Sequence, residues 1–104
     1  MSKIDALMKT FDKRLMETVS VIHAAFDEAP HVVAFVEVEK KLSTSAKLEK
    51  AFMLTNTIND AWWNNKEVTK MFGSDGCRST SVGDMILIGK EKYKCEKSGW
   101  ELMK

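Results

Sequence analysis

The chain has 104 residues, of which 44% are hydrophobic and 30% charged, and its formal net charge is +1. This length predicts one domain, residues 1–104, and the composition is that of a globular protein. So small a net charge excludes a global field that attracts nucleic acid or anionic lipid. No apolar run approaches the ~18 residues that span a membrane, and no signal peptide is recognised. We therefore expect a cytoplasmic protein without a membrane partner.

The first 26 residues follow a helical pattern. Large apolar residues recur there at steps of three and four, at Ile4, Met8, Phe11, Leu15, Val19, Ile22 and Phe26. The mean step of about 3.67 residues is that of a straight amphipathic helix, which Pro30 would end. We therefore predict a long N-terminal helix within residues 1–29. A helix of ~36 Å is as long as a domain of this size is wide, so its overhanging end is a candidate homodimer contact.

The pattern changes after Pro30. Residues 31–39 (HVVAFVEVE) are β-branched or aromatic and predict a strand. The polar stretch at 43–45 offers N-cap residues for a second, shorter helix from about 46 to 57. Residues 68–72 fit either a short strand or one helical turn.

The C-terminal part predicts strands. Residues 84–89 and 92–96 form a hairpin pattern, and residues 99–103 predict a final strand. The expected fold class is therefore α+β, in which the long N-terminal helix and the second helix pack on a small, mainly antiparallel sheet. The α+β core would comprise residues 31–103, with residues 1–29 as a helical extension.

Three tryptophans, Trp62, Trp63 and Trp100, flank this sheet pattern. An indole is an effective platform for a base or a peptide, but three of them also suffice to close a small core. Because neighbouring side chains diverge in an extended chain, Trp62 and Trp63 cannot both point inward. We expect one of this pair to be partly exposed, and it is the best single interaction candidate.

The segment Arg78-Ser79-Thr80-Ser81-Val82-Gly83-Asp84 is a second candidate site. Its arginine, its three hydroxyls at Ser79, Thr80 and Ser81, and its backbone amides could cradle a phosphate. The competing interpretation is a structural turn, in which the hydroxyls bond local backbone, Gly83 supplies an unusual dihedral and Asp84 closes the turn. We favour the turn, because a strand rather than a helix follows.

Three lysines, Lys90, Lys92 and Lys94, alternate along the predicted hairpin and would share one face. With Arg78 they could contact the phosphates of DNA or RNA. They could equally protect a sheet edge against aggregation. Residues 61–104 carry eight Lys or Arg and six Asp or Glu, a net of only +2, which favours the solvated edge.

The cysteines and histidines form no recognisable catalytic or metal pattern. Cys77 and Cys95 lie 18 positions apart, and together with His23 and His31 they lack the paired spacing of a zinc site. Without an export signal, buried thiols are expected rather than a disulfide. Neither histidine has a placed nucleophile or carboxylate partner. We predict no metal, no cofactor and no catalytic residue.

From Thr55 to Trp100 the chain resembles an uncharacterised family of short proteins carried by phages, archaeal viruses and plasmids. The residues that carry the resemblance are Thr55, Asn56, Ile58, Trp62, Trp63, Asn65, the segment from Arg78 to Asp84, Tyr93, Cys95, Gly99 and Trp100. The match covers residues 31–103 and leaves the N-terminal segment outside. It implies a fold and an origin in a mobile genetic element, and no activity.

The leading hypothesis is therefore a small non-enzymatic accessory protein of a phage or mobile element that binds a host or viral protein. It would use the exposed member of the Trp62–Trp63 pair and the overhanging helix. The alternative is a small nucleic-acid-binding module that uses Arg78 and the lysine-bearing hairpin face. An enzyme is the least favoured of the three classes.

Overall fold

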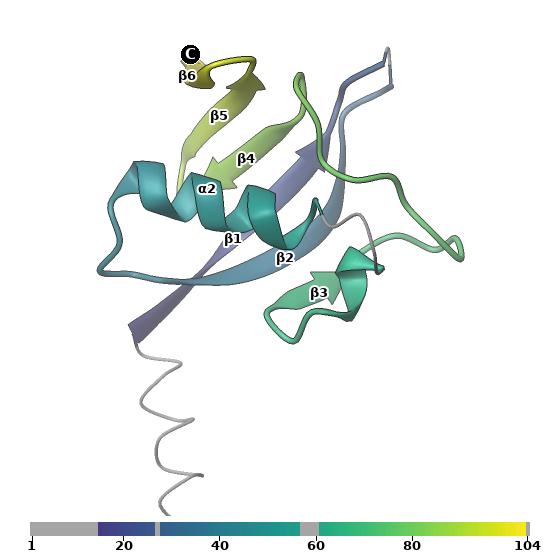
Figure 1. Cartoon of the computed structure of the whole chain (residues 1–104), viewed down its shortest axis with the longest axis horizontal. Helices are drawn as coiled ribbons and strands as arrows, with labels where there is room; N and C mark the ends of the chain where they lie inside the picture. The colour runs from purple at the N-terminus through teal and green to yellow at the C-terminus, as the bar shows by residue number, and fades with distance from the viewer. Residues whose placement is uncertain (1–14, 27, 57–60, 104) are drawn as a thin grey trace, which may run out of the picture.

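A computed structural model describes residues 15–26, 28–56 and 61–103 (Figure 1). The elements are the strands β1 (Met16–His23), β2 (His31–Glu39), β3 (Val68–Lys70), β4 (Met85–Ile88), β5 (Glu91–Glu96) and β6 (Gly99–Met103), the helix α2 (Thr44–Leu54) and the 3-10 turn η1 (Trp62–Asn64). The strands form one antiparallel sheet in the order β3-β2-β1-β4-β5-β6, and α2 lies across one face. No helix in these ranges is long and apolar enough to cross a membrane.

The prediction of two helices on a small sheet is wrong, because residues 16–23 form β1, a central strand. The residues Thr18 to Ile22 are all β-branched except Ser20, and such side chains favour a pleated strand over a helix. The predicted apolar stripe is also broken, since Val19 is fully buried whereas Phe26 is 73% exposed. The remainder of the predicted helix, residues 1–14, lies outside the described residues, and so does the overhanging end that was expected to make a homodimer contact.

The true period of β1 is two. Val19 and Val21 point to the helix side of the sheet and are fully buried, and they pair with Val36 and Ala34 of β2. The register shifts after Val21, which leaves Val33 as an extra residue on β2. A bulge of this kind turns two successive side chains inward, and both Val33 and Ala34 are in fact fully buried.

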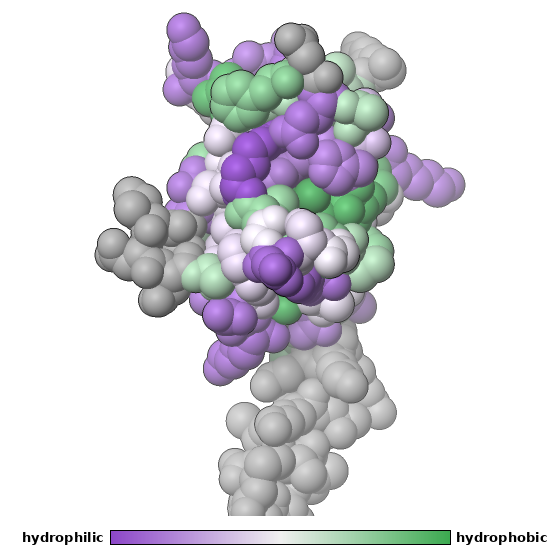
Figure 2. Space-filling view, turned by 90° about the vertical axis from the view of Figure 1, so that its right-hand side faces the viewer, coloured by the Kyte–Doolittle hydropathy of each residue, from purple (hydrophilic) through white to green (hydrophobic). Residues whose placement is uncertain are grey.

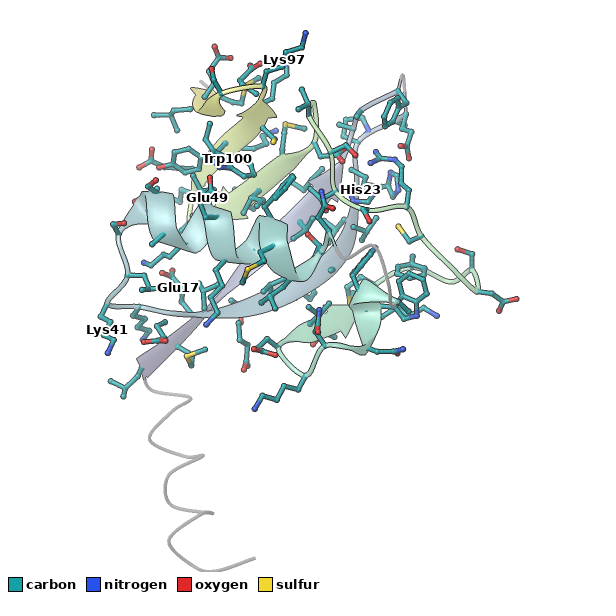
Figure 3. The ribbon with its side chains drawn as sticks, viewed as in Figure 1. Glu17, His23, Lys41, Glu49, Lys97 and Trp100 are labelled. Atoms are coloured by element: carbon teal, nitrogen blue, oxygen red, sulfur yellow. The ribbon has the colours of Figure 1, made fainter. Side chains whose placement is uncertain are left out.

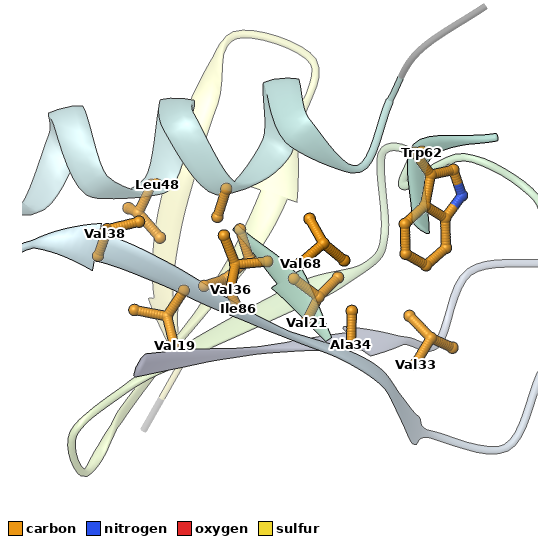
Figure 4. Packing of buried hydrophobic residues seen from close by; sticks show 11 residues of the cluster. Val19, Val21, Val33, Ala34, Val36, Val38, Leu48, Trp62, Val68 and Ile86 are labelled. Atoms are coloured by element: carbon orange, nitrogen blue, oxygen red, sulfur yellow. The ribbon is translucent and has the colours of Figure 1, made fainter. Parts of the chain in front are cut away.

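The core lies between α2 and the sheet (Figure 4). Leu48 and Ala51 of α2 face the valines of β1 and β2 and Ile86 of β4. The helix begins as the sequence predicts, because the Ser43 hydroxyl accepts a hydrogen bond from the Ala46 amide at 3.1 Å. At one end of this layer Trp62 closes the core.

The other elements predicted after Pro30 are confirmed with small shifts of their ends. β2 matches its predicted range, β4 and β5 form the hairpin, β6 follows, and residues 68–70 form the short strand β3 rather than a helical turn. Trp100 of β6 packs edge to face on Phe52 of α2 and donates to Glu49 at 3.2 Å (Figure 3). The helix is thereby held over both halves of the sheet.

The two interpretations of residues 16–23 predict opposite effects of Val21→Ala. In the sheet, the lost methyl groups leave a fully buried site, so the free energy of unfolding should fall by about 2 kcal/mol. On the predicted helix, residue 21 lies off the apolar stripe and alanine is the better helix former, so stability would be unchanged or higher. Urea unfolding measures the difference, with Thr18→Ala on the exposed side of β1 as the matched control.

Candidate functional site

The connection from β3 to β4, residues 71–84, runs along the end of the sheet where β1 turns into β2 (Figure 1). It is anchored at three points by backbone hydrogen bonds, from Met71 to Val33 at 2.9 Å, from Thr80 to Thr55 at 3.0 Å and from Gly83 to Cys95 at 2.9 Å. This end of the molecule therefore collects residues from β1, β2, α2 and the connection. It contains both the Trp62–Trp63 pair and the segment from Arg78 to Asp84.

The centre of this end is the carboxylate of Asp84, which has no exposed surface. It accepts hydrogen bonds from the amides of Ala24 and Ala25 at 2.8 and 2.9 Å and from the amide of Ser81 at 2.8 Å. The Arg78 guanidinium adds two more, at 2.7 and 2.8 Å, in a bidentate arrangement. Burial alone would raise the pKa of Asp84, but these five donors outweigh it and hold the pKa at about 2.

Arg78 is shared between two carboxylates. Its Nε donates to Glu28 at 2.6 Å on the side away from Asp84, and its Nη1 also donates to the carbonyl of Ser79. The hydrogen bond to Asp84, followed by that to Glu28, raises the pKa of Arg78 further above its usual range. The positive charge of Arg78, which a bound phosphate would need, is thus already neutralised by carboxylates of the protein.

The hydroxyl of Ser81 also bonds within the protein. Ser81 donates to the carbonyl of Ser79 at 3.2 Å, and the amide of Asp84 donates to the carbonyl of Ser81 at 3.0 Å. Gly83 has φ +99°, and a Cβ there would lie 3.1 Å from that of Ala25. These are the local bonds and the unusual dihedral of a tight turn, so the geometry supports the structural interpretation over the phosphate cradle.

Thr80 points into the interior, where it joins a buried polar chain. Its hydroxyl is fully buried, contacts Nε2 of His23 at 3.1 Å and donates to the Thr55 hydroxyl at 2.8 Å. The Asn56 side chain donates to the carbonyl of Thr80 at 2.8 Å. Within the described residues no buried side-chain nitrogen or oxygen lacks a hydrogen-bond partner. Thr80 therefore ties α2 to the end of β1.

The two neighbouring tryptophans differ in exposure as expected, although they lie in the 3-10 turn η1 and not in an extended chain. Trp62 is 2% exposed, and its indole nitrogen donates to the carbonyls of Cys77 and Arg78 at 3.2 and 3.1 Å. Trp63 is half-buried and packs edge to face against both Trp62 and Phe72, with ring centroids 5.4 Å apart in each case. Trp63 is therefore the partly exposed member of the pair.

Phe26 is the most exposed of the large apolar residues in the described part of the chain, at 73%. It is also the one non-glycine residue there with a positive φ, of 58°. The Arg78 guanidinium carbon lies 4.9 Å from its ring centroid, which is a cation–π contact. The Phe26 ring thus packs against the hydrogen-bonded guanidinium of Arg78 at the turn between β1 and β2.

The lysines are placed less regularly than predicted. Lys90 lies in the two-residue turn between β4 and β5, whereas Lys92 and Lys94 lie on β5. Lys94 pairs with Met85 and with Glu101, so both lysines of the strand face away from α2. Arg78 is not part of this face, and the proposed phosphate stripe is reduced to lysines interspersed with acidic residues.

Sequence reasoning did not find His23, Phe26 and Glu28, which complete this end of the molecule. The apolar stripe places His23 and Phe26 on a helix, whereas the alternation from Thr18 to Val21 indicates a strand, at whose end His23 lies. No local pattern joins Glu28 to Arg78, which lies 50 residues away. Among the described residues, no three His, Cys, Asp or Glu are grouped so as to hold a metal ion.

Comparisons with known proteins add no assignment. No protein-family model matches the chain, and neither a curated protein nor a solved structure matches it. The resemblance to the family of mobile-element proteins, and the origin that it implies, stay predictions.

The low pKa of Asp84 predicts a specific acid sensitivity. A carboxyl group with a pKa of 3.8 in the unfolded chain and about 2 in the fold stabilises the protein above pH 4. This contribution, about 2 kcal/mol, should disappear as the pH falls from 4 to 2. We expect Asp84→Asn to be less stable at pH 7 and to lack this part of the pH dependence. Asp75→Asn, at an exposed turn position, is the control in urea titrations at each pH.

Proposed function

We propose that the protein is a non-enzymatic binding module that recognises another protein through its end surface, defined here as Phe26, Val82 and Trp63. The observation that carries the proposal is the state of Phe26, which is exposed and has left-handed backbone. Left-handed backbone costs a bulky residue ~1–2 kcal/mol, and an exposed ring recovers little of that by burial. The one compensation shown is the contact with Arg78, worth ~0.5–1 kcal/mol at an exposed site. Folding therefore gains little from this side chain, and its exposure favours a role in binding.

The base beneath Phe26 is rigid. Arg78 is held by Glu28 on one side and by Asp84 on the other, and Asp84 in turn holds the amides of Ala24 and Ala25 directly before Phe26. A side chain fixed in this way loses little conformational entropy when it enters a partner. A pre-ordered aromatic ring is the usual anchor of a protein–protein interface.

Trp63 and Val82 extend the same surface. Gly76 lies against the Trp63 ring, since a Cβ there would be 3.6 Å from the indole. Arg78, which contacts Phe26, is only two residues further along the chain. Val82 is 46% exposed and precedes Gly83, which contacts Ala25. Figure 2, which faces this end, shows green apolar areas separated by purple polar ones. Separate apolar anchors among polar residues fit a partner with distinct apolar pockets rather than one flat hydrophobic face.

Site-specific photo-crosslinking tests the proposal. With p-benzoylphenylalanine at position 26, we expect crosslinked protein adducts that excess wild-type protein competes away, and that Phe26→Asn or Trp63→Ala protein competes away at least tenfold less well. The probe at Met53, which is 61% exposed on α2, is the matched control and should give no such adduct. Phe26→Asn should stay within about 1 kcal/mol of wild-type stability, because asparagine tolerates left-handed backbone.

Three results would count against this proposal. Equal competition by wild type and variants would show that the end surface is not the contact, and a dominant adduct from position 53 would move the contact to α2. The third is single-stranded nucleic acid binding that falls steeply with salt, is lost in Lys92→Ala and Lys94→Ala, and is untouched by Phe26→Asn. That result would replace protein binding by the nucleic-acid alternative.

A further inference from the structure

A thiol and an imidazole lie in contact at this end of the molecule, and the protein-binding surface proposed above includes neither of them. The Sγ atom of Cys77 lies 3.7 Å from Nδ1 of His23, within hydrogen-bonding range for sulfur. Cys77 is half-buried on the connection, whereas His23 is 1% exposed at the end of β1 (Figure 3). The second free cysteine, Cys95, is buried, and its sulfur contacts the carbonyl of Glu96 at 3.8 Å. The two thiols therefore differ in both access and partner.

The buried hydrogen-bond chain determines which nitrogen of His23 carries the proton. The Thr55 hydroxyl donates its one proton to the carbonyl of Ala51 at 2.8 Å, so it accepts from the Thr80 hydroxyl. Thr80 has then used its own proton, and its oxygen can only accept from Nε2 of His23 at 3.1 Å. The Asp84 carboxylate, 3.8 Å from the same nitrogen, favours a proton there too. Nδ1 is consequently unprotonated, and its lone pair faces the thiol of Cys77.

We propose that Cys77 is a thiol–disulfide exchange site, with His23 as its general base, that reacts preferentially with positively charged small-molecule disulfides. In the reaction the thiol proton passes to Nδ1 of His23 while Sγ forms a bond to one sulfur of the disulfide. The original S–S bond breaks, and the leaving thiolate takes up the proton from the imidazolium. The products are a mixed disulfide on Cys77 and one free small thiol, so the disulfide itself is the oxidant and no further reagent is needed.

The surroundings of the pair explain why the base is required. Burial raises the pKa of the Cys77 thiol, and burial, followed in size by an opposing effect of Asp84, lowers the pKa of His23. Both groups therefore rest in their neutral forms at pH 7, and little free thiolate is present. Transfer of the thiol proton to His23 generates the nucleophilic thiolate during the reaction itself. The nearby Asp84 carboxylate stabilises the imidazolium that forms.

The charges around the pair also set the preference among disulfides. The groups that face it are Arg78, Glu28, Asp84 and His31. Among the carboxylates and the guanidinium, Glu28 and Asp84 together exceed Arg78 by one negative charge. A cationic disulfide is attracted to this site and an anionic one is repelled, most strongly at low ionic strength.

The pH profile of the exchange rate in the otherwise unchanged protein tests the role of His23. We use cystamine as the cationic disulfide and peptide mass spectrometry to follow Cys77 and Cys95 separately. General-base catalysis predicts a rate that is flat within about twofold between roughly pH 7 and 8.5, from the ordinary imidazole pKa toward the thiol pKa. A free thiolate mechanism instead predicts a rise of about tenfold per pH unit. Cys77 should react at least tenfold faster than Cys95 throughout.

Two further measurements complete the test. His23→Gln, checked for folding by near-ultraviolet circular dichroism, should convert the flat profile into the tenfold-per-unit rise. Cystamine should react faster than bis(2-hydroxyethyl) disulfide, and that in turn faster than dithiodipropionate, with the differences shrinking in 1 M salt. A sloping wild-type profile, equal reaction of both cysteines, or a fastest anionic disulfide would each overturn the proposal. If His23→Gln does not fold, the wild-type profile alone decides.

Discussion

The buried carboxylate of Asp84 is the constraint on which the end of this fold depends. It joins the first turn after β1 to the start of β4, since its side chain holds the amides of Ala24 and Ala25 while its backbone pairs with Cys95 of β5. A charge without solvent contact is stable only when its hydrogen bonds are complete. Five donors meet that demand here, two from the turn after β1 and three from the 71–84 connection. One side chain thereby joins the 71–84 connection to the turn after β1, which lies 60 positions away in the sequence.

The features with functional potential all derive their positions from that constraint. Arg78 is oriented by Asp84 and carries the ring of Phe26, while the carbonyls of Cys77 and Arg78 receive the indole N–H of Trp62. The apolar core between α2 and the sheet contributes stability but offers no unusual chemistry. At the polar end, the desolvation of buried charged groups and the left-handed backbone at Phe26 are both unfavourable in free energy. Such a division, in which strain and buried charge gather away from the main core, is typical of a rigid scaffold that presents a site.

The sequence was sufficient for the elements after Pro30 and insufficient for those before it, for a physical reason. Residues such as Val19 and Ile22 satisfy a helical step of three, but in β1 they point to opposite faces of the sheet, so a stripe drawn through the large apolar residues alone suggests a helix that is not there. The local signal for the strand lies in Thr18 and Val21, because β-branched residues are poor helix formers with strong strand preference. A stripe of large residues outweighed that local signal. The strand β3 was ambiguous for the reverse reason, since three residues are too few to show any period.

The candidate site was predictable in its parts and not in its assembly. The roles of Gly83 and Asp84 follow from local backbone chemistry, and the structure has both as described by that chemistry. The unequal exposure of Trp62 and Trp63 was also expected, but the pair lies in the 3-10 turn η1 and not in the extended chain from which it was argued. The bonds that give the site its properties join residues 50 to 60 positions apart, such as Glu28 with Arg78 and His23 with Thr80. Those pairs exist because β1 is a central strand whose end meets the 71–84 connection. A helix over the same residues would have separated His23 from Cys77, so the assignment of one element decides whether this protein has a buried imidazole beside a thiol at all.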